Sequence, residues 1–120
     1  MRRSRRSVAL VSLALAAATV FAGCGGEKTD HLKADDGPIE GGNGITPAKL
    51  TAKKGDKVEI QVTNTAKDKQ HGFSIDDFNV HEVIDQGKTS TVKFKASKAG
   101  TFKVYCQLHP AHKPSELTVS

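Results

Sequence analysis

Apolar and polar residues alternate with a period of two through most of the chain beyond residue 45, which is typical of β-strands with one buried face. Turn-forming residues such as Gly55-Asp56 and Ala99-Gly100 separate the runs, and no long segment has helical periodicity. The sequence therefore predicts an all-β fold, an antiparallel β-sandwich in one domain over residues 45–120. The clearest runs place these apolar residues on one face: Val58, Ile60 and Val62; Val92, Phe94 and Ala96; Phe102, Val104 and Cys106; Leu117 and Val119.

Two strands end in residues that can bind a metal. His71 shares a strand face with Phe73 and Ile75, and Cys106 shares one with Phe102 and Val104. The aromatic and aliphatic members of both faces are core residues by type, so we expect the imidazole and the thiol to point inward. The alternatives are a core histidine held by hydrogen bonds and a cysteine that serves as a small apolar side chain.

A short segment after the second strand adds two histidines. Cys106, His109 and His112 lie within seven residues, and His71 precedes Cys106 by 35 residues. One thiolate with two or more imidazoles is the ligand set of copper electron-transfer sites, whereas zinc sites more often have paired cysteines. We therefore predict one copper ion per domain, bound by His71, Cys106, His109 and His112. For His112 a solvent-facing position is the alternative.

The segment from residue 24 to residue 44 is rich in glycine and charge and has few large apolar residues. This composition predicts a flexible tether between the N-terminus and the folded domain. His31 lies in this segment, and we expect it to be solvated. His81 lies at a spacing that does not match the inward-facing residues, so we expect it at the surface of a strand.

Residues 1–23 resemble an export signal. Four arginines precede an apolar run from Val8 to Ala22, which is about 15 residues and short for a membrane-spanning helix. Ala22 and Gly23 before Cys24 resemble a bacterial lipobox, which implies cleavage before Cys24 and lipidation of that residue. An uncleaved anchor helix is the alternative, and the arginines fit a twin-arginine signal as well as an ordinary basic region.

Most of the net positive charge of the chain lies in this leader. The sequence has 18 basic and 13 acidic residues and a formal net charge of +5. Four of the basic residues are the leader arginines, so 14 remain against 13 beyond residue 23. We therefore expect no nucleic-acid partner. With Cys24 lipidated, Cys106 would be a lone thiol in an oxidising compartment, which favours a functional role for it.

The segment from Lys54 to Val119 resembles the cupredoxins, and within them most closely nitrosocyanin-like proteins. The shared motifs are Gly72-Phe73-Ser74-Ile75-Asp76, Glu82-Val83-Ile84, Ala99-Gly100 and Cys106-Gln107-Leu108-His109-Pro110. The resemblance implies a Greek-key sandwich and copper ligation by Cys106, His109 and His112. His71 stands where nitrosocyanin has a glutamate. The short ligand loop is also similar to that of amicyanin, which has a methionine where this chain has His112.

These features together predict an electron carrier at the outer face of a bacterial cell membrane, anchored by lipid and facing the periplasm or cell exterior. Its partner would be a redox protein. The alternatives are a copper storage or delivery protein that serves a copper acceptor, and a nitrosocyanin-like redox protein that binds nitric oxide. Because four protein ligands leave little room for a substrate, an electron-transfer role is favoured over an enzymatic one.

Overall fold

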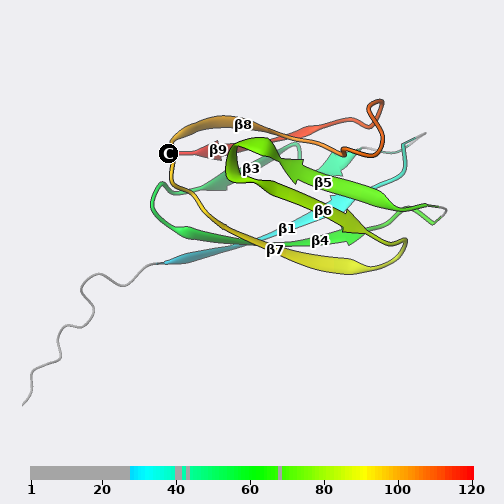
Figure 1. Cartoon of the computed structure of the whole chain (residues 1–120), viewed down its shortest axis with the longest axis horizontal. Helices are drawn as coiled ribbons and strands as arrows, with labels where there is room; N and C mark the ends of the chain where they lie inside the picture. The colour runs from blue at the N-terminus through cyan, green and yellow to red at the C-terminus, as the bar shows by residue number, and fades with distance from the viewer. Residues whose placement is uncertain (1–27, 40–41, 43, 68) are drawn as a thin grey trace, which may run out of the picture.

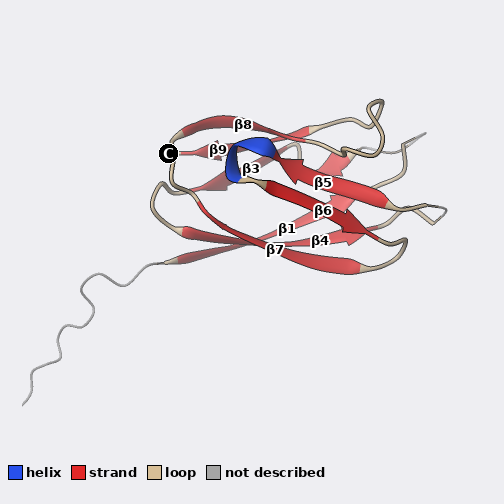
Figure 2. Ribbon diagram, in the orientation of Figure 1, coloured by secondary structure: helices blue, strands red, loops and turns tan. Residues whose placement is uncertain are grey.

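The computed structural model describes residues 28–39, 42, 44–67 and 69–120, and these residues form an all-β structure (Figures 1 and 2). One short 3-10 helix, Asp76–Phe78, interrupts the strands. None of the helices in this part of the chain is long and apolar enough to cross a membrane. The strands are β1 (Thr29–Asp36), β2 (Ile45–Thr46), β3 (Lys49–Ala52), β4 (Lys57–Asn64), β5 (His71–Ile75), β6 (Val80–Ile84), β7 (Thr89–Lys95), β8 (Gly100–Val104) and β9 (Ser115–Val119).

The strands pack as two layers. One layer is the sheet β2-β1-β4-β7, and the other contains β3-β9-β8 and the hairpin β5-β6 (Figure 1). A β-bridge between Ser74 and Tyr105 joins the hairpin to the end of β8. The predicted all-β sandwich is confirmed. Two of its pairs, β1 with β4 and β3 with β9, are parallel, so the sheets are mixed rather than antiparallel throughout.

The inward faces of both layers form one hydrophobic core, and the predicted alternation places the expected residues in it. Along β4, the side chains of Val58, Ile60 and Val62 are at most 1% exposed, whereas Lys57 and Gln61 on the other face are exposed to solvent. All five residues of β5 are buried, because the strand lies between β6 and the end of β8 and is covered on its outer face as well. Phe73, with no exposed area, is the largest fully buried side chain.

The predicted tether is wrong for residues 29–36, which form strand β1. This strand pairs in parallel with β4 along its whole length, from Thr29 opposite Lys57 to Asp36 opposite Asn64. Ala34 and Asp36 are buried and Leu32 is partly buried, while the alternate residues face solvent. The composition of the segment favoured disorder, but its period of two lets it bury one face against the core. Residues 1–27, which include the predicted leader and Cys24, lie outside the described residues.

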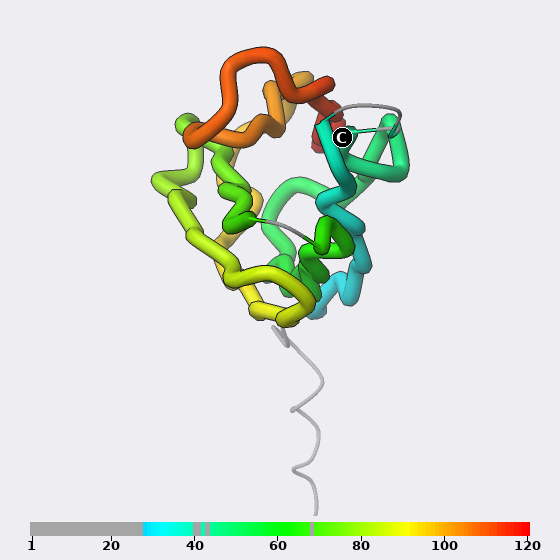
Figure 3. Tube along the Cα trace, turned by 90° about the vertical axis from the view of Figure 1, so that its right-hand side faces the viewer, coloured from blue at the N-terminus to red at the C-terminus, as the bar shows by residue number. Residues whose placement is uncertain are grey.

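One end of the sandwich gathers the residues predicted to bind copper. There β1 ends at Asp36, β5 begins at His71, and residues 105–114 connect β8 to β9. In Figure 1 this end lies on the right, and the orange connection runs along it. Figure 3 views the same end face-on and shows the connection passing from the side of β5 to the side of β1. Asp36 from β1 in one layer and His71 from β5 in the other thus lie at the same end of the sandwich.

Candidate metal centre

Two consecutive turns shape the segment that follows β8. The backbone N–H of His109 donates to the carbonyl of Cys106 at 3.3 Å, and the N–H of His112 donates to the carbonyl of His109 at 3.0 Å. Each turn spans three residues, so His109 and His112 both come back close to Cys106. The spacing Cys-x-x-His-x-x-His thus becomes a compact group of side chains.

His71, the first residue of β5, meets Cys106, which lies two residues after the end of β8. Both side chains face inward, as predicted. Cys106 Sγ lies 3.9 Å from His71 Nδ1 and 3.4 Å from His109 Nδ1. Donor atoms of His71, Cys106 and His112 all lie within 4.8 Å of one another. Two donors bound to one ion at about 2.0–2.3 Å are roughly 3–4 Å apart, so the two distances from Cys106 Sγ fit a shared metal. His109 lies outside this group of three and joins it through its contact with Cys106 Sγ. We call His71, Cys106, His109 and His112 the donor cluster.

His112 is buried in the donor cluster, with 3% of its surface exposed. Its ring lies 4.9 Å from that of His71, measured between centroids. Nε2 donates to the carbonyl oxygen of Gly37 at 2.6 Å, which leaves Nδ1 as the ring's acceptor nitrogen. This atom is buried and has no hydrogen-bond partner. A histidine that donates one ring N–H to a backbone carbonyl and keeps the other nitrogen free is oriented as metal-binding histidines are.

The thiol is held in place by the start of β5. The backbone N–H of Gly72 donates to Cys106 Sγ at 3.1 Å, which would stabilise a thiolate. The neighbouring Gln107 folds over the outer face of β5, where it accepts from Ser74 Oγ at 2.7 Å and donates to the carbonyl of Glu82 at 3.0 Å. A side chain at Gly72 would collide with this amide, so Gln107 would have to leave its place there.

Asp36, which the sequence did not predict as a ligand, is buried beside the donor cluster. Asp36 has no exposed area, and its Oδ1 lies 3.4 Å from His71 Nδ1 and 3.3 Å from His112 Nε2. Burial raises the pKa of the Asp36 carboxyl from 3.8 to about 7. The sequence offered one signal for this position, the alternation of Leu32, Ala34 and Asp36, which the acidic and glycine-rich surroundings obscured.

The donor cluster reaches the surface at one side. His109 is partly exposed, and Leu108, Pro110 and Ala111 around it are exposed. Leu108, at 41%, is one of two large apolar side chains exposed among the described residues. The two other described histidines lie apart from this place, as expected. His31 is 70% exposed beside Glu59, and His81 is 49% exposed beside Asp76.

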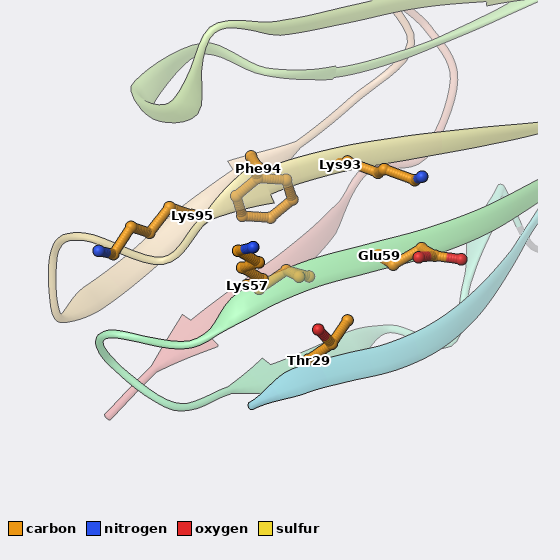
Figure 4. Close-up of a pocket in the computed structure, with 7 residues that line it drawn as sticks. Thr29, Lys57, Glu59, Lys93, Phe94 and Lys95 are labelled. Carbon is orange, nitrogen blue, oxygen red and sulfur yellow. The ribbon is translucent and has the colours of Figure 1, made fainter. Parts of the chain in front are cut away.

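A separate shallow pocket lies at the other end of β1, away from the donor cluster. Figure 4 shows its lining from β1, β4 and β7, with Phe94 between the flanking lysines. Lys93 and Lys95 alternate with Phe94 along β7, so the charged residues are the solvated positions of a half-buried strand. The lining offers no thiol or imidazole, and none of the predicted site residues belongs to it.

The comparison with protein families agrees with this architecture. The family of cupredoxin-like domains matches residues 8–119, so the chain belongs to the cupredoxin-like family. The closer likeness to nitrosocyanin stays a prediction.

Known proteins similar to the chain include a curated enzyme and two proteins of solved structure. The nitrous-oxide reductase of Cupriavidus necator is 43% identical over 56 residues, which are 45% of this chain and 9% of that enzyme. Auracyanin of Roseiflexus castenholzii is 17% identical with a TM-score of 0.63, covering 78% of this chain and 98% of auracyanin. A purple cupredoxin of Nitrosopumilus maritimus is 20% identical with a TM-score of 0.54, covering 74% and 99%.

All four residues predicted as ligands are thus brought together at one end of a cupredoxin-like sandwich. Whether each of them binds copper stays a prediction. In the part of the chain that the structure describes, Cys106 is buried and forms no disulfide, which keeps its thiol available to a metal.

Proposed function

We propose that the chain is a copper-binding electron carrier attached to the outer face of a bacterial cell membrane. The observation on which this rests is the buried donor cluster, in which one thiol and three imidazoles converge at one end of a rigid sandwich. Its donor set fits copper, because thiolate and imidazole together favour this metal. A bound copper ion would supply one-electron chemistry by changing between Cu(I) and Cu(II).

The protein would contribute a site whose shape is fixed before the metal enters. His71 belongs to a wholly buried strand, and Gly72 N–H and Gly37 carbonyl hold Cys106 and His112 from outside the donor cluster. Such support limits the rearrangement that a change of oxidation state would require. The apolar residues beside His109 would let a redox partner approach the site closely without a large desolvation cost.

Spectra of the copper-loaded chain test this proposal. Cu(II) should give a thiolate-to-copper charge-transfer band and an EPR signal, and voltammetry should show fast, reversible one-electron exchange. Transfer of Cu(I) to a copper-free acceptor without redox cycling would favour delivery instead. A spectral change with nitric oxide would favour the nitrosocyanin-like role. The absence of any charge-transfer band would contradict the site assignment.

Replacing His112 with methionine should change the optical spectrum and raise the reduction potential. Methionine is a softer, weaker ligand than imidazole, so His112→Met should stabilise Cu(I) and make the protein bluer. The control is His81→Met, which makes the same change at an exposed histidine. Optical spectra and voltammetry of both variants measure the effect. Indistinguishable values for His112→Met and the native protein would show that His112 is not a ligand.

The membrane location rests on residues outside the described part of the chain, where the leader resembles a lipoprotein signal. Cys24→Ser should release the protein from the membrane fraction, because the lipid would be attached through this cysteine. Fractionation of expressing cells, followed by detection of the protein in membrane and soluble fractions, measures this. A Cys24→Ser protein that stays firmly in the membrane would point to an uncleaved apolar helix.

A further inference from the structure

Asp36 brings a buried carboxylate to the donor cluster from the opposite sheet. It is the last residue of β1, whereas His71 and Cys106 belong to the other layer. Its Oδ1 lies 3.4 Å from His71 Nδ1, the nitrogen that also lies 3.9 Å from Cys106 Sγ. The carboxylate oxygen and the sulfur are thus neighbours of the same ring nitrogen. The 3.4 Å between the carboxylate oxygen and His71 Nδ1 matches the separation of two donors that share an ion.

The surroundings of Asp36 provide no hydrogen bond to this carboxylate. Both oxygens are buried, and neither has a hydrogen-bond partner. The nearest N–H group on His112 is directed to the carbonyl of Gly37 at 2.6 Å, which is shorter than its 3.3 Å distance from Asp36. Buried carboxylates in proteins are normally paired, hydrogen-bonded or bound to a metal. Here its close polar neighbours are the rings of His71 and His112, at 3.4 and 3.3 Å. When these rings bind copper as neutral imidazoles they give the carboxylate no cation to pair with, so the metal ion is its remaining partner.

We propose that Asp36 supplies a carboxylate oxygen to the copper ion, which adds an oxygen ligand to the sulfur and nitrogen ligands of the donor cluster. This inference rests on the proposed function, since it needs the same ion. A thiolate and a carboxylate together neutralise Cu(II), whereas with Cu(I) the buried centre has one net negative charge. Because an uncompensated charge is costly in a buried site, Asp36 stabilises Cu(II) over Cu(I). The hard oxygen acts in the same direction.

The test compares Asp36→Asn with Asp35→Asn in the full chain. Both variants remove one negative charge from β1, but Asp35 is exposed and faces away from the core. Asp36→Asn should bind Cu(II) at least about 10-fold more weakly, retain most of its Cu(I) affinity and therefore have a higher reduction potential. Asp35→Asn should match the native chain. Competition titrations with chelators specific for each oxidation state, together with voltammetry, measure these quantities.

The comparison of the two oxidation states separates a ligand from a residue that only positions the histidines. If Asp36 merely held His71 or His112, its removal would weaken Cu(II) and Cu(I) binding alike and leave the potential unchanged. That result would overturn the proposal, as would unchanged affinities. A native chain without any thiolate-to-copper band would instead contradict the proposed function, so the two failures are distinguishable.

Asp36→Asn should also show that the carboxylate is not needed for folding. The amide has the same shape and carries no charge, so the metal-free variant should have a melting temperature at or above that of the native chain. If the variant does not fold, isotope-edited infrared spectra of the native chain replace it. With 13C-labelled aspartate, copper loading should shift one carboxylate band, and the absence of a shifted band would overturn the proposal.

Discussion

Cys106→Ser should abolish the visible charge-transfer band of the copper-loaded protein completely. The thiolate is the group whose electrons give rise to this band, and a serine hydroxyl at the same place is a poor copper ligand. The variant should nevertheless fold, because the core is formed by the alternating apolar residues of both sheets. Gly72 N–H can still donate to the hydroxyl oxygen, so the loss of stability should not exceed about 1–3 kcal/mol.

Optical spectra with Cu(II) and far-ultraviolet circular dichroism test this prediction together. Thr91→Ser is the control, since it introduces the same residue at an exposed position of β7 outside the donor cluster. A band that survives in Cys106→Ser would show that another group is its source. A variant that loses the β-sheet signal would show that Cys106 is needed for the fold rather than for the metal.

Phe73→Ala should destabilise the metal-free domain by about 3–5 kcal/mol, the largest loss that we expect from a core substitution. Phe73 has no exposed area and lies in the strand that presents His71. Typical domains are stable by about 5–15 kcal/mol, so the variant would approach the limit of folding. Because β5 is buried on both faces, the neighbouring strands cannot easily close over the missing ring.

Urea unfolding followed by circular dichroism measures this effect. Val83→Ala on β6 is the control, because Val83 is 48% exposed and its truncation should change the free energy of unfolding by about 0.5 kcal/mol or less. A loss below about 1 kcal/mol for Phe73→Ala would mean that the core relaxes around the cavity. The importance assigned to β5 in supporting the site would then be wrong.

Much of the sandwich could be predicted from the sequence because its strands alternate clearly. The runs around Ile60, Val92 and Leu117 each place apolar residues on one face, and the structure buries these residues. The same parity argument predicted that His71 and Cys106 face inward, and their burial confirms it. Periodicity reports the local environment of each strand, which is why these predictions held.

Strand β1 could not be predicted in the same way, because its stability comes from a distant partner. Its inward face contains only Leu32 and Ala34 before Asp36, which is too little apolar surface to indicate a strand by itself. The segment becomes ordered by pairing with β4, and no local pattern encodes that parallel pairing. The role of Asp36 was therefore missed, since the residue had been assigned to a solvated tether.

The position of His112 shows a second limit of sequence reasoning. Its spacing from His109 allowed either a ligand or a solvent-facing residue, because loops have no regular periodicity. Two backbone contacts decide its position, the turn from His109 and the hydrogen bond to the Gly37 carbonyl. Gly37 directly follows β1, so the burial of His112 depends on a strand that the composition of residues 24–44 did not indicate.

The donors at this end of the sandwich come from both sheets, and this has a mechanical consequence. An ion that binds Asp36 from one layer and Cys106 from the other would act as a clip between segments far apart in the sequence. Such a clip closes a long loop and so lowers the entropy of the unfolded chain. It would also resist the sliding of one sheet over the other at that end only. A copper-loaded molecule would then open from the opposite end, where no such ion joins the two layers.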